Sequence, residues 1–483
     1  MKQLRLLPAA CAVWAATLLA LHGNWCIVVP VFALVLWRWQ RGQAILCAAL
    51  SALAIVVTKV RLARAVPLGD VLTGTVISDP SETRGGWLLR LRVPGYPFQV
   101  PVFADEPAPS GAEVTISHGR LTSLTPPDSL AAHVAENFRE LVVTTVGPSS
   151  QGLLPGMVLG DTTLQDAAEK QLYIDTGLSH LSAVSGSNVA IVCSAAALLV
   201  KGPRLRVAAS LAALVVFVLL VGFEPSVQRA AVMGLVGLLA VLNSSRMEPM
   251  HGLSLAIIVL LFIDSELCSS FGFALSVVAT AGIVVVSPLL YRHLAVIGWP
   301  DIFIRALAVA IAADLVTMPI VALMAGEVSV VSVLANVLVA PATAPVTILG
   351  LIAAIFAQLG PLSVLGAGLL AVAEPFTWWI NTIAHGCTGL PLNTVAASPF
   401  LVLLAYGWVV AGIIYRRPLL TLLCVIAVLV PRHLETPQKP VHVVATEEDV
   451  YPIPPGTCSI VVTEDSPPDY PTRTPEGIPV FYR

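Results

Sequence analysis

A short run of polar side chains stands at the start of a strongly apolar segment. His180, Ser185, Ser187 and Asn188 precede a stretch that stays apolar to residue 200. A serine and a histidine could act as nucleophile and general base. However, five residues apart on one helix is poor geometry for direct contact, and no G-x-S-x-G elbow is present. Two interpretations stay open: these side chains hydrogen-bond neighbouring helices, or they line a polar constriction.

A helix between two turns must position this run. Thr162 is the expected N-cap, with Gln165 completing a capping box, and Gly177 is the expected C′ glycine. The residues between them follow the pattern of an amphipathic helix lying on a membrane or on other helices. At about 1.5 Å per residue, this helix would separate Asp161 from His180 by about 20 Å unless the chain folds back.

The composition is that of a membrane protein. Of the 483 residues, 57% are hydrophobic and only 11% are charged, against about 25% charged in ordinary soluble domains. The mean hydropathy is +0.86. A net charge of -3 leaves no global basic field, so any nucleic-acid role would depend on a local groove or pore. The eight cysteines contain no C-x-x-C pair, and neither a zinc site nor a disulfide framework is predicted.

Apolar segments occupy most of the chain, and some are shorter than the ~20 residues that span a bilayer comfortably. They are predicted at about 6–21, 25–37, 44–60, 178–200, 207–223, 227–242, 250–264, 268–290, 303–324, 330–358, 361–388, 396–414 and 418–431. We expect a polytopic α-helical membrane protein with roughly eleven to thirteen membrane segments, some of them re-entrant. Pro341 and Pro345 are expected to break the 330–358 segment, which would imply a cavity beside it.

The segment 67–147 has a different pattern. Polar and apolar residues alternate in Val71–Val76 and Trp87–Val93, and turn signals such as Asp79-Pro80 and Pro94-Gly95 separate such stretches. These features predict a small all-β domain inserted between membrane helices. The predicted parts are therefore N-terminal transmembrane helices at 1–64, the β-domain at 67–147, a helical membrane domain at 151–431 and a disordered, proline-rich tail at 432–483.

The positive residues predict the topology. Lys2 and Arg5 place the N-terminus in the cytoplasm. Three helices then place the β-domain outside, and the later arginine-rich turns alternate so that the tail also lies outside. Ionisable residues also occur among the predicted helices, and such charges are costly there and usually functional. Glu224 and Arg229 could form a structural ion pair or could take part in function.

Four ordered stretches carry a resemblance to a known family. G-L-L-P-G-M-V-L-G-D at 152–161 with G-L-S-H-L-S-A-V-S-G-S-N-V at 177–189 resembles the signature of the ComEC competence-protein family. V-G-F-E-P-S-V-Q-R-A-A-V-M at 221–233 resembles its G-F-x-P-S-x-x-R-A-x-x-M element. F-G-F-A-L-S-V-V-A-T at 271–280 resembles its G-F-x-L-S-F-x-A-T element. Glu327-Val328-Ser329, followed by Leu334-Ala335-Asn336 and Pro341, is similar to its Q-V-S…L-x-N…P element.

The resemblance implies a channel that imports single-stranded DNA across the bacterial cytoplasmic (inner) membrane during natural transformation. It implies an OB-like fold for the β-domain and a competence-type channel at 151–431. Partners would be single-stranded DNA, membrane lipid, a DNA receptor, a helicase or ATPase and a separate nuclease, with a possible homo-oligomer. Asn188 stands where many members have histidine, which argues against a titrating or metal-binding role there. No H-x-H-x-D-H motif of the family's metallo-β-lactamase-like domain occurs. We therefore expect a channel and not an enzyme, with no metal or cofactor.

The candidate residues follow from these elements. The candidates for the translocation path are Gly160, Asp161, Gly177, His180, Ser185, Gly186, Asn188, Glu224, Arg229 and Asn336. The candidates for DNA binding on the β-domain are Arg84, Trp87, Arg90 and Arg92, although its aromatic residues could equally form its core. One alternative is an inner-membrane permease for a small molecule or polyanion without a DNA role. Another is a membrane enzyme, for which His180 with Asp161 is the nearest candidate pair.

Overall fold

The structure is a computed structural model that describes most of the chain. The described residues are 6–22, 41–65, 68–77, 80–83, 86–182, 184, 186–221, 225–242, 248–390, 394–400, 402, 407, 441–444, 459–462 and 480–482. The chain divides into two compact units, Met1–Tyr406 and Gly407–Arg483, and each is described by itself.

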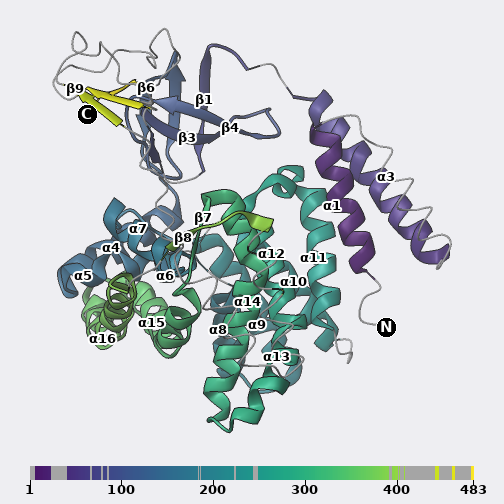
Figure 1. Ribbon diagram of the computed structural model, residues 1–483. Helices are drawn as coiled ribbons and strands as arrows, with labels where there is room; N and C mark the ends of the chain where they lie inside the picture. Colours follow the sequence, from purple (N-terminus) through teal and green to yellow (C-terminus); the bar gives the residue numbers. More distant parts are fainter. Residues whose placement is uncertain are drawn as a thin grey trace. The chain divides into compact units, whose positions relative to one another are not determined.

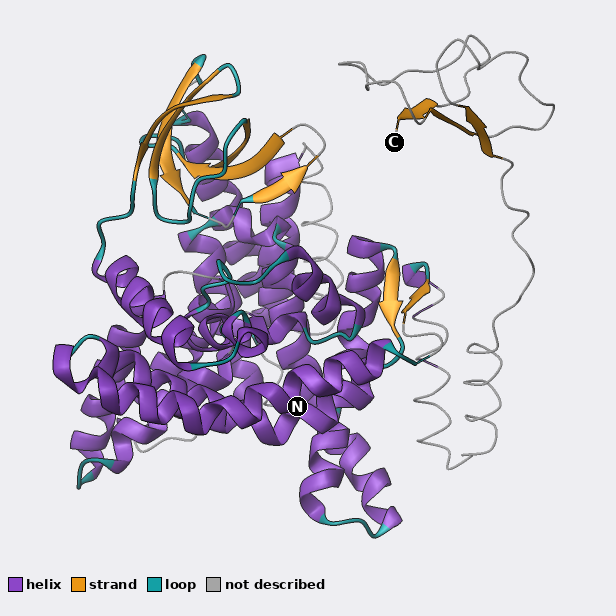
Figure 2. Ribbon diagram, turned by 90° about the vertical axis from the view of Figure 1, so that its left-hand side faces the viewer, coloured by secondary structure: helices purple, strands orange, loops and turns teal. Residues whose placement is uncertain are grey.

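A six-stranded antiparallel sheet forms within the segment predicted to be all-β (Figure 2). Its strands are β1 (Val71–Val76), β2 (Ser81–Thr83), β3 (Gly86–Arg92), β4 (Gln99–Ala104), β5 (Glu113–Ser117) and β6 (Arg120–Thr125). The strand order is β2-β3-β1-β5-β6, with β4 also paired to β3. Alternate residues such as Leu89, Leu91, Val114 and Ile116 fill its core, as the period-2 pattern predicts. The segment thus contains a small antiparallel sheet, but the predicted boundary at 147 is wrong: the sheet ends at Thr125, and Leu130–Thr145 forms a helix whose apolar face packs with other helices.

The helices of the first unit pack in three groups around separate hydrophobic cores (Figure 1). The first group contains α1 (Leu7–His22), α3 (Arg41–Ala63), α11 (Pro249–Ile263) and α12 (Phe271–Val285). The second contains α8 (Gly186–Leu198), α9 (Pro203–Val221) and α10 (Pro225–Leu242). The third contains α4 (Leu130–Thr145), α6 (Leu153–Leu159), α7 (Ala167–Asp175), α15 (Ser332–Ala357) and α16 (Ser363–Thr388). Helix α14 (Asp301–Ala325) packs against both α12 and α15 and so joins the first and third groups.

Short elements connect these helices. They are α5 (Pro148–Gln151), η2 (Ser179–Ser182), η3 (Ser265–Ser269), α13 (Ser287–Leu294), η4 (Ala295–Ile297) and η5 (Gly360–Leu362). A two-stranded antiparallel ribbon of β7 (Glu327–Ser329) and β8 (Thr394–Ala396) follows α14 and α16. Its register pairs Glu327 with Ala396, so the segment between α14 and α15 is held to the segment that follows α16.

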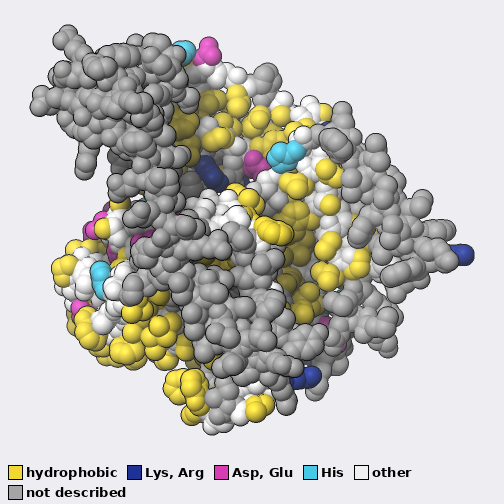
Figure 3. All heavy atoms as spheres, in the orientation of Figure 1, with side chains coloured by type: hydrophobic (Ala, Val, Ile, Leu, Met, Phe, Trp, Pro, Cys, Tyr) yellow, Lys and Arg dark blue, Asp and Glu magenta, His cyan; other side chains and the backbone are white. Residues whose placement is uncertain are grey.

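Five helices are long and apolar enough to cross a membrane: α3, α9, α14, α15 and α16 with η5. The bent pair of α12 and α13 would make a sixth span, and α1, α8, α10 and α11 contain shorter apolar stretches. Large hydrophobic side chains such as Val364, Val372 and Trp378 of α16 are exposed, and Figure 3 shows hydrophobic side chains gathered over this helix. This is the surface of a polytopic membrane protein. The predicted segments 25–37 and 418–431 lie outside the described residues.

The expectation that Pro341 and Pro345 break their segment is wrong. Helix α15 runs without interruption through both prolines. The hydroxyls of Thr343 and Thr347 donate to carbonyls one turn back, and Trp379 Nε1 of α16 donates to the Leu338 carbonyl at 2.9 Å. Helix α15 also packs extensively against α16, and packing against neighbouring helices lets a membrane helix tolerate proline. The cavity inferred from a break at this point therefore has no support from α15.

The second unit contains three short strands. They are β9 (Val441–Val444), β10 (Ser459–Val462) and β11 (Val480–Tyr482), and β10 pairs in parallel with both others. They lie in the segment 432–483, predicted to be a disordered tail. At these positions the chain forms strands, because apolar residues such as Ile460, Val461 and Phe481 pair there. The remainder of the predicted tail lies outside the described residues.

Candidate functional site at the junction of four sequence elements

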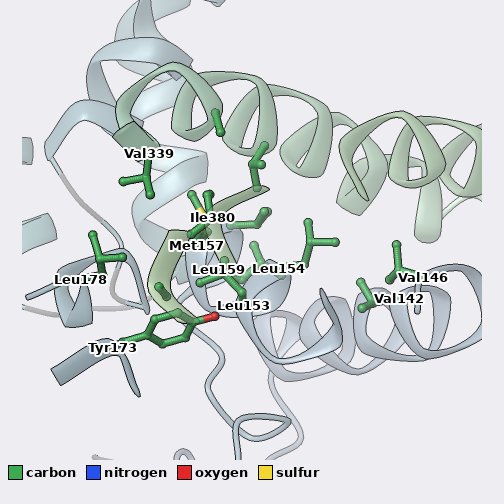
Figure 4. Packing of buried hydrophobic residues seen from close by; sticks show 14 of the residues in the cluster. Val142, Val146, Leu153, Leu154, Met157, Leu159, Tyr173, Leu178, Val339 and Ile380 are labelled. Atoms are coloured by element: carbon green, nitrogen blue, oxygen red, sulfur yellow. The ribbon is translucent and has the colours of Figure 1, made fainter. Parts of the chain in front are cut away.

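The element at 152–161 forms the centre of the third helical group. All seven residues of α6 are buried, and Figure 4 shows Leu153, Leu154 and Met157 among side chains from α4, α15 and α16. A Cβ added to Gly350 of α15 would lie only 2.3 Å from Val158 Cγ2. Because real Cβ atoms do not come so close, only glycine allows α15 to approach α6 this tightly. Gly350 is not among the residues predicted from the sequence.

The end of α6 explains Gly160 and Asp161. Gly160 adopts φ +78° and terminates the helix, a conformation that favours glycine. Asp161 Oδ2 accepts a hydrogen bond from Arg139 Nε of α4 at 2.8 Å, and its Oδ1 accepts from the Thr163 amide at 3.1 Å. Both side chains of the ion pair are partly buried. Asp161 therefore fixes the loop after α6 to α4, and the structure does not pair it with His180.

Asn188 closes the same helix end from α8. Its Nδ2 donates to the Met157 carbonyl of α6 at 2.9 Å, and both groups are buried. The last carbonyls of a helix have no partner within the helix. Asn188 therefore satisfies one of them and joins α8 to α6. This position matches the first of the two open interpretations, a polar side chain that bonds a neighbouring helix.

The predicted helix after Asp161 exists but starts later than expected. Asp166, not Thr162, is the N-cap of α7, and its carboxylate accepts from the Glu169 amide at 2.6 Å. Gln165 does not form a capping box, because it is buried and its Nε2 donates to Ser182 Oγ at 2.9 Å. An aspartate is as good an N-cap as a threonine, so the local sequence offered two starts.

The predicted C′ glycine is confirmed, and it contacts the fourth element. Gly177 has φ +69°, and a Cβ there would lie 2.4 Å from Ser332 Cβ at the start of α15. Asn336 Nδ2 donates to the carbonyls of Ser332 at 2.9 Å and Gly177 at 3.5 Å. Ser332 Oγ in turn donates to Asp314 Oδ1 of α14 at 2.5 Å. The structure thus brings together two predicted site residues, Gly177 and Asn336, that are far apart in sequence.

His180 lies beside this turn in η2. Its side chain is exposed. An imidazole there can offer a donor and an acceptor in its neutral form.

The second and third elements meet the first at Gly186 and Arg229. A Cβ added to Gly186 of α8 would lie 3.4 Å from both Arg229 Nη2 and Ala230 Cβ of α10. Arg229 is only 8% exposed, and its Nε donates to Ser276 Oγ of α12 at 2.8 Å. Among the described residues, no carboxylate lies within ion-pair distance of Arg229. Ser185 and Glu224 lie outside the described residues, so a Glu224–Arg229 pair stays a prediction.

The candidate residues of the sheet divide between its two faces. Arg90 and Arg92 are exposed on one face of β3, while Leu89 and Leu91 are buried on the other. Trp87 is half-buried on the core side, opposite Ala104 of β4. Arg84 lies outside the described residues. The predicted pair of arginines on one face is confirmed, and Trp87 belongs to the other face.

These contacts connect all four sequence elements through the stretch 177–189. Gly177 meets Ser332 and Asn336, Gly186 meets Arg229, and Arg229 meets Ser276. A protein-family model described as competence protein matches residues 157–419. The chain belongs to the competence protein family. No curated protein and no solved structure matches it. Among the described residues, no group of three histidine, cysteine or acidic side chains is arranged to hold a metal ion.

Proposed function

We propose that this competence protein is the channel subunit of a bacterial DNA-uptake system. In this proposal it moves single-stranded DNA across the cytoplasmic membrane during natural transformation. One observation carries the proposal: Arg229 is buried where three of the matched elements meet, beside Gly186 and Ser276, and no carboxylate among the described residues lies within ion-pair distance of it. Pores for anions and phosphates place arginine or lysine along the route, and a charge at membrane depth is costly and usually functional.

The small residues at the junction support a route for a polymer. Gly177 and Gly186 stand where a larger side chain would contact Ser332 or Arg229, so the backbone is closely approached at both points. His180 presents an exposed polar ring three residues after Gly177. Neutral polar groups around one positive charge suit a polyanion better than a ring of carboxylates would.

The β-domain would receive the strand as an OB-like surface outside the cytoplasm. Two exposed arginines, Arg90 and Arg92, lie on one face of β3, and single-stranded nucleic acids bind grooves that combine positive charge with aromatic rings. In this proposal the channel works with a DNA receptor, a helicase or ATPase and a separate nuclease. The channel could be a homo-oligomer. The chain itself acts as a channel and not as an enzyme.

A charge series at Arg229 tests this function. Arg229→Lys keeps the positive charge and Arg229→Gln removes it, and both are measured as transformation frequency at matched membrane abundance. Removing a charged hydrogen-bonding group from its site should lower transformation by at least about tenfold, with Arg229→Lys retaining more activity. Arg305→Gln is the control, because Arg305 is exposed and pairs with Asp301 on the surface of α14. Unchanged transformation with Arg229→Gln would favour a permease without a DNA role.

A further inference from the structure

The start of β4 contacts the turn between α11 and α12 through a carboxylate. The backbone amide of Gln99 donates to Glu266 Oε2 at 2.9 Å. Glu266 is half-buried in η3, and burial raises the pKa of its carboxyl; the Gln99 hydrogen bond and the charges of Arg92 and Arg90 partly oppose that change, and the charge of Asp264 adds to it. Gln99 is paired with Arg92 in the sheet, so the carboxylate lies beside the strand that carries the two exposed arginines.

The arginines are near Glu266 without being bound by it. Among the described residues, neither Arg90 nor Arg92 forms an ion pair within 4.0 Å of a carboxylate, and both side chains are exposed. The carboxylate is therefore held by one backbone amide and by attraction across a longer distance. A backbone N–H flanked by two guanidinium groups is the donor set that binds phosphate oxygens in nucleic-acid complexes.

An aromatic pair adjoins the same donor set. Tyr96 and Phe98 lie in the β3–β4 hairpin directly before Gln99, with ring centroids 6.0 Å apart in an edge-to-face arrangement. Both are partly exposed. Bases of single strands stack on exposed aromatic rings of this kind. Inorganic phosphate and the headgroup of phosphatidylglycerol carry no base that could stack on these rings. The hairpin thus favours a nucleotide over other phosphate ligands.

We propose that the Gln99 amide, Arg90 and Arg92 form a binding position for a backbone phosphate of single-stranded DNA, and that the Glu266 carboxylate occupies this position until DNA displaces it. The proposal rests on the proposed function and names the first contact of the strand. Glu266 acts as a built-in competitor, which lowers the apparent affinity for DNA in proportion to its occupancy.

Displacement of Glu266 would affect a turn that also holds the N-terminal helices. The turn that carries it also accepts hydrogen bonds from α3 and α1. Arg61 Nη1 donates to Ser265 Oγ at 2.8 Å, and Trp14 Nε1 donates to the Cys268 carbonyl at 2.9 Å. The sheet, α1 and α3 are therefore all fastened to the one turn between α11 and α12, and a strand that binds the sheet loosens one of these attachments.

The test measures binding of a fluorescein-labelled oligothymidylate to the full-length protein in detergent, at one fixed ionic strength. Glu266→Gln removes the competing charge and keeps an oxygen that can accept from Gln99. Its apparent Kd should fall by about three- to tenfold. Glu106→Gln is the matched control, because Glu106 is an exposed carboxylate after β4 and its loss changes the net charge equally. Its Kd should stay within about twofold of the wild type.

The arginines provide the second arm. In a protein that carries Arg90→Gln and Arg92→Gln, binding should be weak, and adding Glu266→Gln should give no gain. Equal effects of Glu266→Gln and Glu106→Gln, or a gain that persists without the arginines, would overturn the proposal. So would a gain seen for inorganic phosphate or phosphatidylglycerol vesicles but not for the oligonucleotide. Absence of oligonucleotide binding with normal transformation would overturn this inference and leave the proposed function standing.

Discussion

Replacing Gly177 by alanine should separate the turn after α7 from α15. Two costs add at this position. The φ of +69° disfavours any L side chain by about 1–2 kcal/mol. The new Cβ would also lie 2.4 Å from Ser332 Cβ and 3.2 Å from Ser332 Cα, and such overpacking costs about 1–3 kcal/mol. Moving the turn away would weaken the Asn336 hydrogen bond to the Gly177 carbonyl, worth about 0.5–1.5 kcal/mol.

A matched glycine isolates the steric part of this cost. Gly326 has φ +73°, and nothing lies within 4 Å of a Cβ added there. Gly326→Ala should therefore cost only the backbone contribution of about 1–2 kcal/mol, against about 2–5 kcal/mol for Gly177→Ala before the weakened Asn336 hydrogen bond is counted. The assay is thermal unfolding of the purified protein in detergent, followed by tryptophan fluorescence. Equal melting temperatures for the two variants would refute the packing of Gly177 against Ser332.

Three further predictions concern import, charge and topology. Gly186→Leu should abolish DNA import at normal abundance, because its Cβ would already lie 3.4 Å from Arg229 Nη2 and the rest of the side chain would extend beyond it. Ser179→Ala, at an exposed position, should have a mild effect. Normal transformation by the leucine variant would contradict this prediction. Burial raises the pKa of Glu169, so the folded protein binds the proton of this carboxyl more tightly than the unfolded chain does. The stability that this difference contributes is present at low pH and is lost as the pH rises through the raised pKa. Glu169→Gln should therefore raise the melting temperature at pH 8 and give little gain at pH 4, and an equal gain at both would count against it. A reporter fused at Ser110 should be active only outside the cytoplasm, and a cytoplasmic signal would overturn the topology.

Local patterns predicted the elements whose cause is local. The alternation around Arg90 and Arg92 placed both on one exposed strand face, because a strand repeats every two residues. Gly177 was predicted as a C′ glycine because few other residues adopt positive φ. The predicted start of α7 is wrong because Thr162 and Asp166 are both acceptable N-caps. The choice between them depends on the hydrogen bond from Gln165 to Ser182, which keeps Gln165 from completing a capping box.

Contacts between distant segments could not be predicted from local patterns. The role of Asn188 depends on the Met157 carbonyl at the end of α6, and nothing in the local sequence names that partner. Gly350 looks like any glycine in an apolar helix until Val158 is placed against it. Proline lacks an amide donor, which predicts a break at Pro341 and Pro345, whereas α15 packs against α16 and continues through both.

Uptake of labelled DNA tests the central claim most directly. A strain that lacks this protein is complemented with the wild type, with Arg229→Gln or with Arg229→Lys, and receives radiolabelled double-stranded DNA. The label that enters the cytoplasm is then measured as nuclease-protected single strands. The account predicts import with the wild type, partial import with Arg229→Lys and little with Arg229→Gln at equal abundance. Equal cytoplasmic label in the deletion strain and the complemented strain would contradict it.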